Sequence, residues 1–228
     1  MSYQEIELAF SKQRLSRFLL ACKNDEAKAL VLYAQNLLLT QKLFTVISCF
    51  EVALRNQIDK VYSAAKGPDW IADSISQNGM FAGKKNTITS DVIKKGLRKL
   101  GHHYSHGKLI AEMDFGWWRY QLAGPQFTAG GQILLAAFPN KPPSTPSKKI
   151  NNKYFFDELV PLNDIRNRLA HHEPICFKKG SNEICSQSVR GEYYSIADLL
   201  NYMGLSLATM LIGLDKVLDC CDHIDNLK

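Results

Sequence analysis

Four side chains close to residue 170 combine groups that bind phosphate with groups that move protons. Arg166 carries a planar guanidinium with a permanent positive charge, which suits it to phosphate oxygens. His171 and His172 titrate near neutral pH and can accept or donate a proton. Asn167 places an amide one helical turn before His171, on the same face of a helix. Residues of these types at this spacing are suited to cleaving a phosphodiester bond.

Prolines bound the segment that carries these residues. Pro161 is typical of a first helical turn and Pro174 of a helix end, so the sequence predicts a helix between them with the histidines in its last turn. Arg166 lies about 100° around such a helix from Asn167, and its long side chain reaches the same groove. A guanidinium, an amide and an imidazole are therefore expected to converge.

A structural role would also account for this run of residues. Arg166 and Arg168 can pair with Asp164 or Glu173, which lie within two turns of a helix. Histidines in a last turn also interact favourably with the helix dipole. From residue types alone the structural role is favoured, and catalysis is a hypothesis.

Apolar residues recur at helical spacing through most of the chain. The stripes cover residues 15–22, residues 30–61 with Asn24 or Asp25 as the cap, and residues 199–218 after the capping-box-like Ser195-Ile-Ala-Asp198. No segment keeps the two-residue alternation of a half-buried strand for long, so we expect an all-α fold. Half of the eight prolines fall within residues 139–149, which predicts an exposed loop inside a single domain spanning residues 1–228.

A second candidate site is basic. The segment Thr89–His103 is expected to form a helix, and four cations lie on one side of it at positions Lys94, Lys95, Arg98 and Lys99. A solvated helix face is the default explanation for such a row. Because the chain has a formal net charge of +6, the same row is the best candidate for contacts with phosphate groups.

Other classes of protein are disfavoured. The six cysteines contain no C-x2-C pair, and no Asp/Glu set has convincing ligand spacing, so we expect reduced thiols, no metal and no cofactor. The N-terminus has no signal-like run, and glycines and prolines interrupt the longest uncharged stretch, Tyr120–Asn140. We therefore expect a cytoplasmic protein with no membrane span.

The run Arg166-Asn-Arg-Leu-Ala-His-His-Glu-Pro-Ile175 resembles the signature of the Abi-like (AbiD/AbiF-type) abortive-infection proteins. These proteins belong to the HEPN superfamily of α-helical ribonucleases. Three further segments resemble family motifs and follow in the same order, namely Leu32-Tyr33-Ala-Gln-Asn36, Glu51-Val-Ala-Leu-Arg55-Asn56 and Phe115-Gly-Trp117-Trp118. The resemblance thus covers most of the chain, and it implies a HEPN-like helical bundle with additional helices.

The resemblance also implies an activity: metal-independent cleavage of RNA in bacterial antiphage defence. In that chemistry the RNA 2′-hydroxyl attacks the neighbouring phosphate, with Arg166, Asn167 and His171 as the catalytic set. His172 satisfies the same spacing, so the choice between the two histidines stays open. Toxins of a related subgroup that a partner nucleotidyltransferase modifies carry Tyr where this chain has Glu173, which speaks against such regulation.

One motif per chain supplies one set of proton-transfer groups, whereas in-line cleavage needs a base and an acid on opposite sides. We therefore expect a homodimer with a shared cleft. Glu51, Arg55 and Asn56 are expected to support the motif helix, and Trp117 and Trp118 to pack rather than stack bases. The alternative function is a non-catalytic RNA-binding or regulatory HEPN module.

Overall fold

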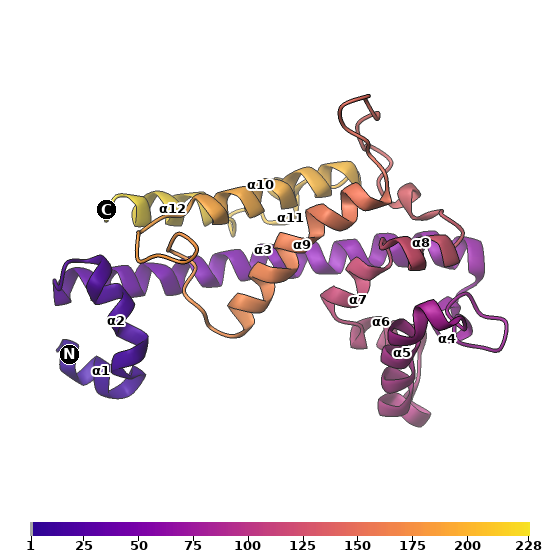
Figure 1. Cartoon of the computed structure of the whole chain (residues 1–228), viewed down its shortest axis with the longest axis horizontal. Helices are drawn as coiled ribbons and strands as arrows, with labels where there is room; N and C mark the ends of the chain where they lie inside the picture. Colours follow the sequence, from indigo (N-terminus) through magenta and orange to yellow (C-terminus); the bar gives the residue numbers. More distant parts are fainter. Residues whose placement is uncertain (1) are drawn as a thin grey trace. The chain divides into compact units, whose positions relative to one another are not determined.

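The computed structural model describes residues 2–228, and every regular element in this range is helical (Figure 1). The one β pairing in the described range is an isolated antiparallel bridge between Phe177 and Ile184. The all-α prediction is therefore confirmed.

The α-helices are α1 (Tyr3–Phe10), α2 (Lys12–Ala21), α3 (Glu26–Lys66), α4 (Trp70–Asp73), α5 (Thr87–Leu100), α6 (His106–Glu112), α7 (Phe115–Tyr120), α8 (Gly124–Ala129), α9 (Asn152–Ala170), α10 (Gln187–Tyr202), α11 (Leu207–Met210) and α12 (Val217–Asp225). The short 3-10 helices are η1 (Lys84–Asn86), η2 (Gly101–His103) and η3 (Leu134–Ala137).

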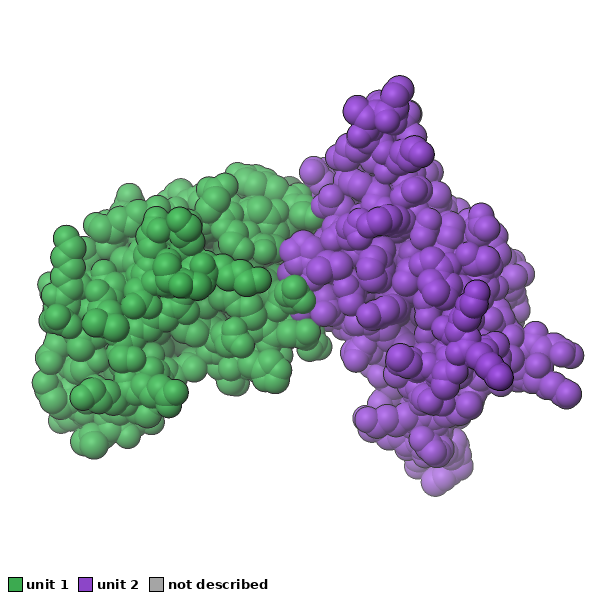
Figure 2. Space-filling view, viewed as in Figure 1, with its two compact units in different colours: residues 1–48, 164–197, 207–228 green, residues 49–163, 198–206 purple. Residues whose placement is uncertain are grey.

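The chain divides into two compact units (Figure 2). Unit 1 comprises residues 1–48, 164–197 and 207–228, and unit 2 comprises residues 49–163 and 198–206. Helices α3, α9 and α10 contribute residues to both units. A single domain over residues 1–228 stays a prediction.

The start of α3 follows from local capping. The Asp25 carboxylate accepts a hydrogen bond from the backbone N–H of Lys28 at 2.9 Å, which satisfies a donor that the first turn leaves without a partner. Asp25 is thus the cap, one of the two residues that the sequence offered. The predicted apolar stripe over residues 30–61 lies entirely within α3, which is 41 residues long.

Aromatic side chains fill the core of unit 1 near its N-terminus. The fully buried Phe18 ring of α2 meets the ring of Tyr33 at 5.1 Å and the ring of Phe177 at 5.1 Å. Edge-to-face pairs at such distances stabilise beyond the area that they bury. The contacts hold α2, α3 and the segment after α9 together within the unit.

The core of unit 2 is built around Trp70, which is 1% exposed. Its indole Nε1 donates to the Asp59 carboxylate at 2.7 Å, and a His106 ring nitrogen lies 2.7 Å from the same oxygen. The rings of Trp117 and Trp118 lie 6.0 and 6.4 Å from the Trp70 ring. Both are buried, which confirms the prediction that they pack in an aromatic cluster.

Two predicted helix starts are wrong. Helix α9 begins at Asn152, and Pro161 lies inside it. Because Pro161 is exposed, solvent can satisfy the carbonyl that the proline ring leaves without a donor. Helix α10 begins at Gln187, so Ser195 lies in its interior rather than at its cap.

The predicted long C-terminal helix is also interrupted. Gly204 has a φ of +77°, and the backbone N–H of Leu205 donates to the Leu200 carbonyl at 2.9 Å while that of Gly204 donates to Asn201 at 3.0 Å. This pair of bonds is the Schellman ending of a helix. The apolar periodicity through residues 199–218 therefore continues across a break, in α11 and α12.

Two other predictions agree with the structure. The basic segment forms α5, shifted by two or three residues at each end from the predicted bounds. Residues 139–149 contain no helix, and residues 143–149 are exposed, as expected for a proline-rich loop.

Candidate functional site

Helix α9 ends in a tight turn at the histidine pair of unit 1. The backbone N–H of Glu173 donates to the Arg168 carbonyl at 2.8 Å, and that of His172 donates to the Leu169 carbonyl at 3.0 Å. His172 has a φ of +57°, which is the left-handed conformation that usually falls to glycine. The histidines thus form the helix cap itself rather than the last helical turn.

The side chain of Arg14 in α2 holds this turn. Its Nη2 donates to the His172 carbonyl at 2.7 Å, and its Nε donates to the Tyr33 hydroxyl at 3.3 Å. A guanidinium at the C-terminal end of a helix also interacts favourably with the helix dipole. Arg14 therefore links α2, α3 and the end of α9 at one point.

Asn36 fixes the segment that follows the turn. Its side-chain oxygen accepts from the backbone N–H groups of Ile175 at 2.9 Å and Cys176 at 3.3 Å. Asn36 is 2% exposed, so these two N–H groups have no access to water as an alternative partner. Tyr33 and Asn36 lie three residues apart on one face of α3, so the same face contacts Arg14 and the segment after the turn.

Arg168 has the structural role that the sequence allowed for it. Its Nη2 donates to the Pro174 carbonyl at 2.6 Å, and its Nε lies 3.3 Å from the Glu173 carboxylate. These contacts brace the same turn from the other side. Arg168 is thereby separated in function from its neighbour Arg166.

The predicted catalytic residues remain accessible. Asn167, His171 and His172 are exposed, and Arg166 is half-buried. The backbone N–H of His171 donates to the Asn167 carbonyl at 3.0 Å, so these two residues are one helical turn apart as predicted. No apolar packing seals these side chains from a substrate.

A pocket of about 340 Å³ lies beside the turn, within unit 1. Its lining includes His172, whereas His171 does not contribute. Its walls come from α1, α2 and α3, with the residues Phe10, Arg14, Tyr33, Asn36, Leu37 and Thr40. The sequence interpretation missed Phe10 and Arg14, because neither belongs to a motif and their partner residue lies far away along the chain.

The predicted supporting residues lie on the part of α3 that belongs to unit 2. Glu51 and Arg55 are half-buried and Asn56 is exposed. Among residues 2–228, the buried Nε of Arg55 has no hydrogen-bond partner. Their support of the motif helix stays a prediction.

The basic row is exposed on α5 in unit 2. Two of its cations are partly neutralised, since Lys94 lies 3.5 Å from Asp91 and Lys99 lies 2.7 Å from Glu112. Lys95 and Arg98 complete the row. Its contact with RNA stays a prediction.

The cysteines have the character expected of packed thiols. All six are free, and four are buried. Burial raises the pKa of the Cys176 thiol to about 12 and that of Cys221 to about 11, which keeps both protonated and unreactive near neutral pH. Within residues 2–228, no group of three or more His, Cys, Asp or Glu side chains is arranged to hold a metal ion.

Helix α3 exposes apolar side chains in unit 1, and it is long and apolar enough to cross a membrane by length and composition alone. Lys42 divides an otherwise uncharged run between Lys28 and Glu51. About 33% of the most apolar window of the helix is buried inside the protein. The absence of a membrane span stays a prediction. The exposed apolar residues of unit 1 on α1 and α3 are Leu8, Phe10, Val31, Leu37, Leu38 and Phe44, which we call the apolar face.

Comparison with known proteins gives no relative. None of the family models, curated proteins or solved structures compared with the chain matches it. What the residues and the fold establish is an all-helical chain whose conspicuous polar feature in unit 1 is an exposed, rigidly held histidine turn.

Proposed function

We propose that this protein is a metal-independent endoribonuclease of the Abi-like HEPN type that acts in the cytoplasm in antiphage defence. The observation that carries the proposal is the histidine turn. Arg14 and Asn36 bind its backbone from distant parts of the chain, yet the histidine side chains remain exposed. His172 is one of five non-glycine residues with a positive φ within residues 2–228, and such backbone is costly.

The chemistry follows from the groups that the turn presents. The 2′ oxygen of the substrate forms a bond to phosphorus as the bond from phosphorus to the 5′ oxygen breaks, which leaves a 2′,3′-cyclic phosphate and a free 5′-hydroxyl. An imidazole of His171 or His172 takes the 2′ proton, and a second imidazole returns a proton to the leaving oxygen. Arg166 stabilises the extra negative charge on phosphorus, and Asn167 orients the histidine or a phosphate oxygen.

A homodimer supplies the second imidazole. Each chain carries one histidine turn, and the apolar face lies on the same helices, α1 and α3, that line the pocket beside His172. Large apolar side chains with this much exposure are candidates for an interaction site. A second copy of the chain on this face buries apolar area and brings two sets of polar groups to one cleft.

The test is cleavage of labelled single-stranded and structured RNA in the presence of a chelator. We expect wild-type protein to produce ends with a 2′,3′-cyclic phosphate and a 5′-hydroxyl. Arg166→Ala and His171→Ala should each reduce the rate by about a hundredfold or more, in line with loss of a general acid–base or charge-stabilising group. His172→Ala decides which histidine transfers the proton.

Lys153→Ala is the matched control, because Lys153 is an exposed cation on α9 far along the helix from the histidines. Cleavage by this variant should equal that of wild type. Activity that disappears with the chelator, or that survives in both Arg166→Ala and His171→Ala, would contradict the proposal.

The basic row on α5 favours a second candidate, a non-catalytic RNA-binding module. Exposed Lys95 and Arg98 provide sequence-independent contacts to phosphates, whose strength falls with salt. RNA binding by wild type without any cleavage, lost in Lys95→Ala/Arg98→Ala, would favour this module over the enzyme.

The dimer has its own test. Light scattering at micromolar concentration should give twice the chain mass for wild type, and Leu37→Asp/Phe44→Asp should shift it to the monomer. Gln41→Ala serves as the control at an exposed polar position of the same helix. Flotation of wild-type protein with lipid vesicles, with no dimer in solution, would instead assign the apolar face to a membrane.

A further inference from the structure

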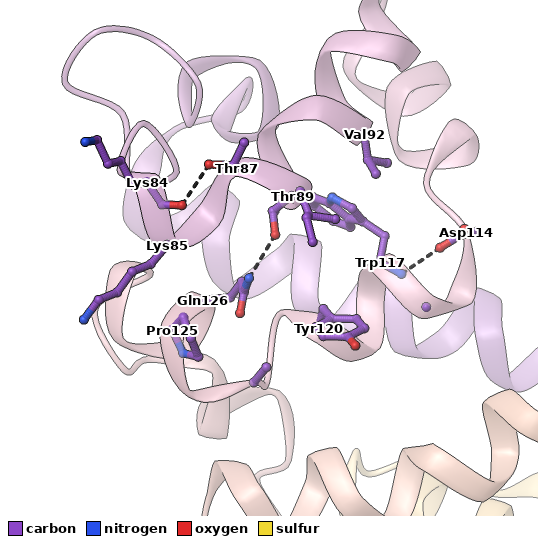
Figure 3. Close-up of a pocket in the computed structure, with 13 residues that line it drawn as sticks. Lys84, Lys85, Thr87, Thr89, Val92, Asp114, Trp117, Tyr120, Pro125 and Gln126 are labelled. Atoms are coloured by element: carbon purple, nitrogen blue, oxygen red, sulfur yellow. Dashed lines mark hydrogen bonds between the residues drawn. The ribbon is translucent and has the colours of Figure 1, made fainter.

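A second pocket lies in unit 2, away from any residue of the proposed reaction (Figure 3). It measures about 560 Å³, within the range of cavities that hold small molecules. The pocket opens between η1, α5, α7 and α8, and its surface is mostly apolar. The proposed function of unit 1 uses none of its lining.

The two ends of this pocket carry opposite charge. Lys84 and Lys85 lie at one end, and Asp114 lies at the other, as Figure 3 shows. All three side chains are exposed, and no ion pair among residues 2–228 joins the two lysines to an acid. A ligand that spans the pocket would therefore present an anion to the lysines and hydrogen-bond donors to the carboxylate.

Asp114 retains acceptor capacity for such donors. One of its oxygens accepts from the backbone N–H of Trp117 at 2.7 Å and caps α7. A carboxylate accepts about four hydrogen bonds, so one oxygen and part of the other stay available. Hydrogen bonds from N–H groups to a carboxylate are among the stronger ones in proteins.

Aromatic surface and a fixed amide lie between the charged ends. Tyr120 is 46% exposed and shows its ring to the pocket, next to Trp117 (Figure 3). The Gln126 side chain donates to the Thr89 hydroxyl at 3.0 Å, which fixes both polar groups in the wall. A planar heterocycle fits against such a surface by stacking and edge hydrogen bonds.

Two buried polar atoms at the pocket have no partner. Trp117 is 5% exposed, and its indole Nε1 finds no acceptor among residues 2–228. Asn86 is 6% exposed, and its side-chain oxygen lacks a donor in the same range. Asn86 lines an adjoining pocket of about 500 Å³ that shares Lys84 and Lys85 with the first. Both atoms have almost no accessible surface, so a ligand in the pocket reaches them only if the wall shifts.

We propose that this pocket binds a guanine nucleotide. The guanine base lies against Tyr120 and presents its adjacent N–H and NH₂ donors to Asp114, and the phosphate binds Lys84 and Lys85. The nucleotide is either free or a guanosine within single-stranded RNA, since both carry the same base and phosphate.

Three variants separate the parts of the site. Lys84→Ala/Lys85→Ala removes the phosphate contacts. Asp114→Asn keeps a good helix cap but replaces an acceptor oxygen with a donor. Lys148→Ala/Lys149→Ala is the matched control, because it removes the same charge from two adjacent exposed lysines of unit 2 outside the pocket.

The measurement is binding of GMP, AMP, guanosine and inorganic phosphate to the full chain, by calorimetry and by quenching of tryptophan fluorescence. We expect GMP to bind about tenfold tighter than AMP, guanosine and phosphate. The lysine variant should lose about tenfold for GMP and nothing for guanosine, and Asp114→Asn should abolish the preference for GMP over AMP. The control variant should bind as wild type does.

One oligonucleotide distinguishes the sources. The competitor is a short single-stranded RNA with one guanosine. If it displaces GMP at a lower concentration than GMP itself does, RNA is the source of the guanosine. If it displaces GMP less well, the ligand is the free nucleotide. Equal binding of GMP and AMP by wild type, or GMP binding that Lys84→Ala/Lys85→Ala leaves unchanged, would overturn the proposal. Because binding is measured without cleavage, this outcome is independent of the ribonuclease activity of unit 1.

Discussion

Helices α9 and α10 end in the same backbone pattern but on different residues. Both close with a Schellman pair of hydrogen bonds, and the left-handed position is Gly204 after α10 but His172 after α9. Glycine adopts this conformation without a steric penalty, whereas a side chain at Cβ makes it costly. The end of α9 is therefore the more strained of the two, as is the end of α2, where Lys23 takes the same position with a φ of +54°.

The supports of the two turns also differ. Asn140 binds the end of α10 just before the Gly204 turn. Its backbone N–H donates to the Tyr202 carbonyl at 2.9 Å, and its side chain donates to the Asn201 carbonyl at 3.3 Å. The His172 turn is held by a buried amide and by a cation. Stronger support at the less favourable residue is what a site with a fixed side-chain geometry needs.

The largest effect is expected at Asn36. Asn36→Leu should lower the free energy of unfolding by about 3 kcal/mol, because two buried N–H groups lose their acceptor. Urea denaturation measures this loss. Gln41→Leu, at an exposed position of the same helix, is the control, and a loss below about 1 kcal/mol for Asn36→Leu would mean that the turn is not held from α3.

A smaller effect is expected at the glycine turn. Gly204→Ala should lower the free energy of unfolding by about 1 kcal/mol. The new Cβ would meet the Asn140 side chain at 3.5 Å, which is an ordinary contact, so the loss comes from the positive φ alone. The measurement is again the midpoint of urea unfolding. Gly107→Ala is the control, because Gly107 has no positive φ and its added Cβ meets nothing within 4 Å. Equal costs at the two glycines would show that the left-handed turn has no special role.

The smallest effect, and one of opposite sign, is expected at the histidine turn. His172→Gly should stabilise the protein by up to about 1 kcal/mol, because it relieves the strain at the left-handed position. If His172 acts on RNA, the same variant should lose cleavage activity. A variant that is both less stable and fully active would contradict the comparison of the two turns.

Sequence periodicity predicted the helices better than their ends. The cap at Asp25 and the basic helix α5 followed from local signals that act within one turn. The starts of α9 and α10 were missed because Pro161 and Ser195 are usual at helix starts yet also occur inside helices supported by packing. The break at Gly204 was missed because the apolar spacing continues beyond it.

The candidate site was predictable only in its local part. The Asn167 and His171 spacing is fixed by the helix, so it could be inferred from residue numbers. The contribution of Arg14 could not be inferred from the sequence, because it depends on a tertiary contact that leaves no local pattern. The pocket of unit 2 likewise joins residues of four separate elements, and of its lining only Gly116 and Trp117 belong to a segment that resembles a family motif.

The contact between Asn36 and Ile175 joins residues 139 positions apart, and that between Arg14 and His172 joins residues 158 apart. Loops of such length close late, after the local helices have formed. During synthesis the ribosome therefore releases most of the chain before the histidines acquire their geometry. A growing or prematurely terminated polypeptide that ends before residue 172 therefore lacks every long-range contact that fixes the backbone around the histidines.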